Sequence, residues 1–154
     1  MLEVSAELVE ETLDHLRAGG RLGTETVVLW LGSRADAAPL VTEVYRPDQV
    51  AALDFFRIPP EAMRRLLGYL RHRRLQVLAQ CHSHPAQAFH SHADDRWAIV
   101  RHVGAFSLVV PWFASRTNVV SFLDDTATFQ LDAADRWREV RSHTALRMTF
   151  DAGT

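Results

Sequence analysis

Half of the eight histidines fall within eleven residues of the chain, and these are His82, His84, His90 and His92. His82 and His84 are two residues apart at the end of an apolar run that we expect to be a strand, so their side chains project from one face. Ten and eleven residues after His84, the chain supplies the carboxylates of Asp94 and Asp95. A catalytic zinc site typically has three protein ligands, such as two imidazoles and one carboxylate, and a water molecule in the fourth position.

Hydrolysis at such a site needs a general base that takes a proton from the bound water. The sequence offers two candidate carboxylates beside apolar runs. Glu25 stands at the start of the run at 26–31, and Glu43 lies inside the run at 40–45. The residues alone leave the choice between Glu25 and Glu43 open.

Other polar side chains near the cluster have simpler interpretations. Ser91 either satisfies local backbone donors or takes part in the chemistry. His90 and His92 are either spare loop residues or groups that support the ligands. Cys81 alternates with His82 along the strand, so we expect a buried structural thiol rather than a nucleophile or a fourth ligand. The histidines outside the cluster are expected at the surface or satisfied in the core, and these are His15, His72, His102 and His143.

Periodicity and turn residues predict an α+β fold with one mixed sheet flanked by helices. An amphipathic helix capped by Ser5 is expected to reach about residue 18, where Gly19 and Gly20 stop it. A second helix begins after Pro59 and ends near residue 73. The expected strands cover residues 26–31, 40–45, 75–84, 106–110, 118–123 and 128–131. Shorter helices are expected at 94–103 and 132–141, and a loop or excursion at 46–58.

The composition narrows the class of protein. The 154 residues predict a single domain over 1–154, and 47% hydrophobic with 23% charged residues is typical of a folded globule. A net charge of −2 gives no electrostatic footprint for nucleic acid. We expect neither a signal peptide nor a membrane span, and the single cysteine favours a reducing, cytoplasmic setting. All 17 basic residues are arginine, which reflects either codon bias or a setting in which lysines are modified.

Taken together, the motifs resemble the JAMM (JAB1/MPN/Mov34) metalloprotease family. HSHP at 82–85 and SHAD at 91–94 follow the order of its His-x-His-Pro and Ser-x-x-Asp signature. ETVVLWLG at 25–32 keeps the glutamate and the final glycine of a Glu-Thr-Gly-Gly-x-Leu-x-Gly pattern common in bacterial members. The resemblance covers roughly residues 4–125 and implies the MPN fold, which is cytidine-deaminase-like. It also selects Glu25 over Glu43.

The resemblance implies a role for each matching residue. His82, His84 and Asp94 would bind Zn²⁺. Glu25 would act as the general base and then as the acid for the leaving amine. Ser91 would hydrogen-bond the water or the tetrahedral oxyanion.

The sequence departs from the family in one spacing. Six residues separate His84 from Ser91, whereas the family usually has seven. The longer spacing would make Asp95 the third ligand and put His92 in the position of the serine. We assign Asp94 because the shorter loop keeps the Ser-x-x-Asp motif whole.

Members of this family are chiefly isopeptidases that remove ubiquitin or ubiquitin-like proteins from lysine side chains. The chain most resembles the small stand-alone prokaryotic type, found beside E1-like and E2-like enzymes and in antiphage operons. The resemblance therefore implies a ubiquitin-like protein as substrate, with those enzymes as candidate partners. The alternatives are a hydrolase of a sulphur-carrier protein or a small amide, and a non-catalytic MPN scaffold. The excursion at 46–58 is a candidate docking surface, although we expect Phe55 and Phe56 in the core.

Overall fold

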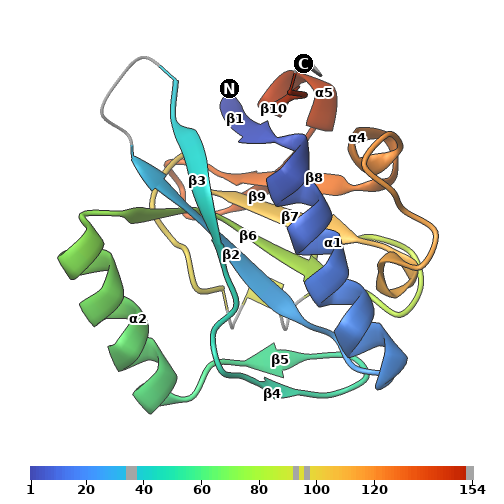
Figure 1. Cartoon of the computed structure of the whole chain (residues 1–154), viewed down its shortest axis with the longest axis horizontal. Coiled ribbons are helices and arrows are strands. Elements are labelled where there is room, and N and C mark those ends of the chain that lie inside the picture. The colour runs from blue at the N-terminus through green and yellow to red at the C-terminus, as the bar shows by residue number, and fades with distance from the viewer. Residues whose placement is uncertain (34–37, 92–93, 96–97, 152–154) are drawn as a thin grey trace.

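The computed structural model describes residues 1–33, 38–91, 94–95 and 98–151. Within these residues, eight strands form one mixed sheet in the order β10-β1-β3-β2-β6-β7-β8-β9 (Figure 1). Its strands are β1 (Leu2–Ser5), β2 (Val27–Ser33), β3 (Leu40–Tyr45), β6 (Gln76–Ser83), β7 (Phe106–Val110), β8 (Ala127–Leu131), β9 (Trp137–Val140) and β10 (Leu146–Thr149). Parallel and antiparallel pairs alternate irregularly across it, so the predicted α+β fold with one mixed sheet is confirmed.

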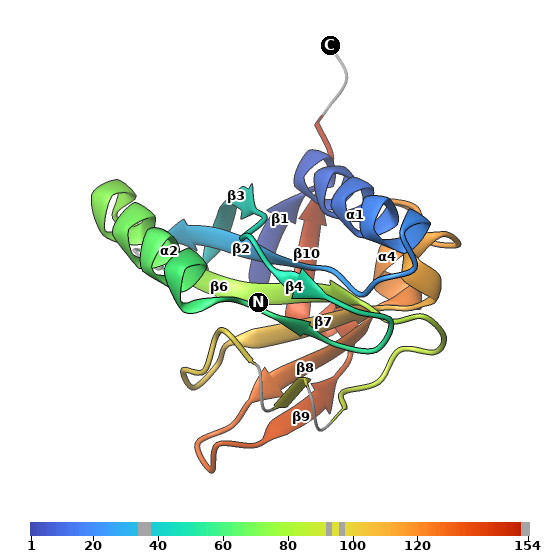
Figure 2. The same cartoon turned by 90° about the horizontal axis from the view of Figure 1, so that it is seen from below.

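Two long helices, α1 (Ala6–Arg21) and α2 (Pro60–Arg73), pack against opposite faces of β2. Val28 and Trp30 belong to the core under α1, whereas Val27, Leu29 and Leu31 belong to the core under α2. Figure 2 shows the two helices apart, with β2 and β3 between them. The remaining elements are the short strands β4 (Val50–Ala51) and β5 (Phe56–Arg57) and the short helices η1 (Trp112–Ala114), α4 (Phe122–Asp125) and α5 (Ser142–Ala145).

The first half of the chain largely follows its predicted elements. Ser5 caps α1, because its Oγ accepts a hydrogen bond from Leu8 N at 3.3 Å. The helix continues through Gly19 and Gly20, however, and ends at Arg21. These glycines allow close packing and do not end the helix, since a Cβ on Gly20 would lie 2.4 Å from Cβ of Phe113.

No helix in the described part of the chain has the length and apolar character needed to cross a membrane.

The strand predicted at 118–123 is wrong. Asn118 Oδ1 accepts from Ser121 N at 3.0 Å, and Ser121 Oγ accepts from Asn118 N at 3.1 Å. Such reciprocal side-chain bonds stabilise a turn in competition with a strand ladder. The apolar residue that follows, Phe122, begins α4 and is buried against Trp30.

The helix predicted at 132–141 is also wrong, because this segment contains a hairpin turn and β9. Asp132 Oδ1 accepts from the amides of Ala134 and Arg136 at 2.8 and 3.0 Å. In a helix these two amides would donate to backbone carbonyls instead. Asp135 also has a left-handed φ of 60°, which is typical of a turn. The residues that follow pair antiparallel with β8, with Trp137 opposite Leu131.

The short helix predicted at 94–103 is wrong for its second part. Asp94 and Asp95 are helical, but residues 98–103 contain only bends and a turn. The amides of Ile99 and Val100 donate to the side chain of Gln80. Residues 92–93 and 96–97 lie outside the described part of the chain.

Gly32, the last residue of the ETVVLWLG motif, lies where β2 changes register against β3. A Cβ there would approach the Leu40 carbonyl oxygen to 1.9 Å, so backbone would have to move. We expect Gly32→Ala to lower the free energy of unfolding by about 1–3 kcal/mol, the usual range for overpacking. Gly68→Ala is the matched control, because nothing lies within 4 Å of its Cβ on α2 and alanine gains about 0.5–1 kcal/mol over glycine in a helix. Urea denaturation measures both, and a neutral Gly32→Ala would contradict this packing.

Candidate active site

His82 and His84 project together from the end of β6. Both side chains are buried, and their Nε2 atoms lie 3.3 Å apart. The alternation of the strand places Ser83 between them on the other side, where its Oγ accepts from Thr26 N at 3.1 Å. The His82 ring packs 5.2 Å from the Phe56 ring, and His84 lies edge-on to Phe89. The predicted pairing of these two imidazoles is therefore present in the structure.

The backbone of His84 is fixed on both sides of the peptide. Its amide donates to Val110 O at 2.9 Å, and its carbonyl accepts from Phe113 N at 2.8 Å. Phe113 lies in η1, where three consecutive non-glycine residues have positive φ angles, 56° for Trp112, 52° for Phe113 and 60° for Ala114. Such angles cost about 1–3 kcal/mol each when the surroundings impose them. No pattern in the sequence predicted this turn, which holds one of the two histidines in place.

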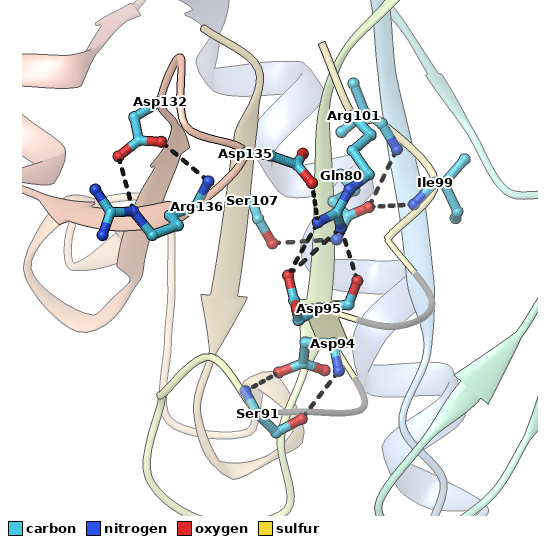
Figure 3. Close-up of polar contacts among 11 residues, drawn as sticks. Gln80, Ser91, Asp94, Asp95, Ile99, Arg101, Ser107, Asp132, Asp135 and Arg136 are labelled. Carbon is cyan, nitrogen blue, oxygen red and sulfur yellow. Dashed lines mark hydrogen bonds and ion pairs between the residues drawn. The ribbon is translucent and has the colours of Figure 1, made fainter. Parts of the chain in front are cut away.

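Asp94 closes the cluster from the connection between β6 and β7. Its Oδ1 lies 3.1 Å from His82 Nε2, and its Oδ2 lies 3.2 Å from His84 Nε2. Ser91 N donates to Asp94 Oδ2 at 2.7 Å, and Ser91 Oγ accepts from Asp94 N at 3.1 Å (Figure 3). This reciprocal pair resembles a capping box and orients the carboxylate toward the histidines. Burial opposes the charge of Asp94, but the hydrogen bonds from His82 and His84 outweigh it and hold its pKa well below the usual range.

The three side chains fit a divalent metal ion. A tetrahedral ion with nitrogen and oxygen ligands at about 2.0–2.1 Å keeps those atoms about 3.3 Å apart. The two ring nitrogens lie 3.3 Å apart, His82 Nε2 lies 3.1 Å from Asp94 Oδ1, and His84 Nε2 lies 3.2 Å from Asp94 Oδ2. The three groups together form the candidate metal site in the described part of the chain. Two ring nitrogens and a carboxylate are also the donor types that zinc prefers.

Glu25 lies just before β2 and points into the same site. Its Oε1 is 3.8 Å from His84 Nε2, and its Oε2 is buried and has no hydrogen-bond partner among the described residues. Burial and the nearby charges of Asp94 and Asp54 raise the pKa of Glu25 to about 8. A buried carboxylate with one free oxygen beside a metal site is placed to exchange a proton.

Glu43, the other candidate base, is elsewhere. It lies on β3, where it accepts a hydrogen bond from Tyr69 OH and forms an ion pair with Arg73 at 2.8 Å. Its carboxylate is therefore used in a partly exposed polar cluster next to α2. The structure brings Glu25, and not Glu43, to the histidines.

The remaining sequence candidates fall outside the cluster. Cys81 faces the core under α1, and burial raises the pKa of its thiol. Asp95 is half exposed and pairs with Arg101 at 3.4 Å. His90 packs between Phe129 and Trp137, and burial lowers its pKa to about 4. His92 lies outside the described residues, and four histidines take no part in the metal group, namely His15, His72, His102 and His143.

Two surfaces flank the site. On one side, Ala52 of the β4–β5 hairpin accepts a hydrogen bond from Glu25 N at 2.7 Å. On the other side, a hollow of about 670 Å³ opens beside Ser91. Its aromatic walls come from Phe89, Phe129 and Trp137, and arginines of the β8–β9 hairpin also line it. The β4–β5 hairpin therefore adjoins the site at Glu25, and this hollow adjoins it at Ser91.

The mixed sheet between two helices and the buried His-His-Asp group together define a metallopeptidase-like domain. The family model for prokaryotic homologs of the JAB domain matches residues 5–139. The chain is 38% identical over 138 residues to the probable metalloprotease y4jG of Sinorhizobium fredii (strain NBRC 101917 / NGR234), covering 87% of this chain and 83% of that protein. The chain therefore belongs to the JAB (JAMM) family, as its motifs predicted.

A solved structure supports the fold alone. The solution structure of protein DSY2949 from Desulfitobacterium hafniense is similar with a TM-score of 0.72, covering 98% of this chain and 94% of that chain. The two sequences are 21% identical over this similarity. Together with the family match, the similarity confirms the predicted MPN fold.

Proposed function

We propose that this chain is a zinc-dependent peptidase or isopeptidase that cleaves the amide bond after the C-terminus of a ubiquitin-like protein. The observation that carries the proposal is the gathering of His82, His84 and Asp94 beside Glu25, whose Oε2 is buried and has no partner in the part of the chain that the structure describes. A scaffold has no need for this set of buried polar groups, because unpaired buried oxygens are costly. We place the activity in the cytoplasm, since the one thiol is free and buried.

Each residue has a distinct part in the proposed hydrolysis. Zinc held by His82, His84 and Asp94 would polarise the scissile carbonyl and lower the pKa of water toward ~7. Glu25 takes the proton from the attacking water, and burial makes its carboxylate a stronger base than an exposed one. As the carbon–nitrogen bond breaks, Glu25 returns that proton to the leaving amine. Ser91 Oγ accepts from Asp94 N, which leaves its own O–H free to donate to the oxyanion.

The β4–β5 hairpin is the proposed docking site for the modifier. Val50, Leu53 and Phe55 expose apolar side chains on or between its strands, and the hairpin contacts Glu25 through Ala52. The expectation that both phenylalanines are core is right for Phe56, which is 2% exposed, and wrong for Phe55, which is 39% exposed. An extended C-terminal tail is able to add a strand to such a hairpin edge.

The function is tested by cleavage of a fusion protein. The zinc-loaded enzyme is incubated with a panel of fusions that carry bacterial ubiquitin-like proteins at their N-termini, and with the same ubiquitin-like proteins conjugated to lysine. We expect cleavage directly after the last residue of the modifier. Cleavage of sulphur-carrier fusions or small amides only would favour the alternative hydrolase, and no cleavage of any of them would favour the scaffold.

Phe55→Ala tests the docking surface. Truncating an exposed aromatic anchor at an interface costs about 1–2 kcal/mol, so we expect KM for the fusion to rise about tenfold while kcat stays near wild type. Val120→Ala is the matched control, because Val120 is 86% exposed on the turn before α4. A KM that Phe55→Ala leaves unchanged would remove this hairpin from the docking site.

A further inference from the structure

Gln80 is a fully buried polar side chain on β6, two residues before His82 and on the same face of the strand. In the antiparallel pairing with β2, Gln80 lies opposite Leu29 and His82 lies opposite Val27. A neutral amide at this depth is tolerated only when its donors and acceptors are paired. The partners of Gln80 are therefore informative about what this side chain does.

The Gln80 amide joins the histidine strand to the chain that follows Asp94. Its Oε1 accepts from Ile99 N at 2.8 Å and from Val100 N at 3.4 Å. Its Nε2 donates to Ser107 Oγ on β7 at 3.2 Å (Figure 3). The side chain of Gln80 thus accepts the hydrogen bonds of two consecutive backbone amides, those of residues 99 and 100.

This attachment matters because Asp94 lies on a long connection. The chain leaves β6 at His84 and returns to the sheet at Phe106, and the two strands it joins run parallel. Ser91 orients the Asp94 carboxylate, but both residues belong to the same connection. A bond within the connection does not by itself set the distance from Asp94 to the histidines.

Arg101 connects the residues that Gln80 holds to Asp95, the neighbour of Asp94. It follows the two residues that Gln80 holds, and its guanidinium donates to the Asp95 carbonyl at 2.9 Å. The same guanidinium pairs with Asp135 in the β8–β9 turn at 3.0 Å. Figure 3 shows Gln80 bonded to Ile99, and Arg101 bonded to Asp95, the residue next to Asp94. The described contacts therefore connect the strand of His82 to the neighbour of Asp94.

We propose that Gln80 is a positioning residue for the metal centre, which sets the place of Asp94 relative to His82 and His84 by fixing residues 99 and 100. The proposal rests on the proposed zinc site, and Gln80 itself touches neither metal nor substrate. Without the Gln80 acceptor, residues 99 and 100 of the connection between β6 and β7 lose their hydrogen bonds to β6. The metal-binding conformation of Asp94 then becomes one of several, and the apparent affinity for zinc falls in proportion.

The test measures zinc affinity and amide exchange in the full chain. Gln80→Leu keeps nearly the volume of the side chain and removes both polar atoms. We expect its Kd for Zn²⁺, from competition with a chromophoric chelator, to rise about tenfold, at the low end of what outer partners of metal ligands contribute. We also expect the amide of Ile99 to exchange with deuterium at least about tenfold faster in the metal-free variant.

Ser107→Ala is the matched control, because it removes the partner of Gln80 Nε2 and leaves the bonds to Ile99 and Val100 in place. We expect a drop in Tm, zinc affinity within about twofold of wild type, and a protected Ile99 amide. An equal loss of zinc affinity in Ser107→Ala would show that Gln80 acts through general stability, and this result would overturn the proposal. Unchanged zinc affinity in a folded Gln80→Leu would overturn it too.

Arg101→Ala covers the case in which Gln80→Leu does not fold, since Arg101 is partly exposed. We expect its zinc affinity to fall about threefold to fivefold, and no change there would reject the proposal. The wild-type titration separates this proposal from the function on which it rests. A wild-type chain that binds no zinc refutes both, whereas a zinc-binding chain indifferent to Gln80 and Arg101 refutes the positioning role alone.

Discussion

Replacing Glu25 with glutamine is expected to lower turnover of the fusion substrate by about 10³-fold, within the range that a positioned acid–base group supplies. The amide of glutamine fills the same space but cannot take up the proton that the water must lose. Glu25 lies 3.8 Å from His84 and outside the three ligands, so zinc affinity should stay within about fivefold of wild type. Single-turnover cleavage and chelator competition measure the two quantities on one preparation.

Glu43→Gln is the control for this change. Glu43, which lies on β3, is the other candidate base that the sequence offered, and its carboxylate interacts with Tyr69 and Arg73. We expect its turnover to stay near wild type, with at most a modest loss of stability. Near-full activity in Glu25→Gln would show that Glu25 is not the general base. An inactive Glu43→Gln that still binds zinc would make Glu43 the candidate base instead.

Alanine at position 94 is expected to raise the Kd for zinc more than 100-fold. Outer partners of metal ligands are worth 10–100-fold, and a direct ligand contributes more. Removing the Asp94 carboxylate also leaves His82 and His84 facing each other at 3.3 Å without a negative charge between them. Zinc content after gel filtration and chelator competition both measure the loss.

Asp95→Ala provides the matched comparison one residue further on. Asp95 is half exposed, and its side chain pairs with Arg101 at the surface. Such pairs contribute about 0–1 kcal/mol, so we expect zinc affinity within about threefold of wild type. The reverse pattern, with zinc lost only in Asp95→Ala, would mean that the family's longer spacing applies to this chain.

The metal group could be predicted because strand periodicity is simple. Two histidines separated by one residue on a strand must share a face, and the structure places their Nε2 atoms in contact. The two long helices could be predicted from apolar residues that repeat at a period of 3.6, and β2 from a continuous β-branched and apolar run that ends at Gly32. The choice of Asp94 needed the family motif, because spacing alone allowed Asp95.

The errors lie where side chains bind nearby backbone. Asp132 turns the chain into a hairpin, Asn118 and Ser121 form a turn, and Gln80 takes the amides of Ile99 and Val100. Periodicity does not report such bonds, since they depend on single side chains and on contacts between distant residues. The left-handed turn of η1 is of the same kind, because tertiary packing imposes it on residues that disfavour it.

The metal ligands can be seen directly by anomalous diffraction at the zinc absorption edge from crystals grown with one equivalent of Zn²⁺. We expect one strong peak about 2.0–2.2 Å from His82 Nε2, His84 Nε2 and a carboxylate oxygen of Asp94, with Glu25 nearby but not bound. A peak elsewhere, or no peak in protein that is folded and zinc-saturated, would contradict the proposed catalytic centre.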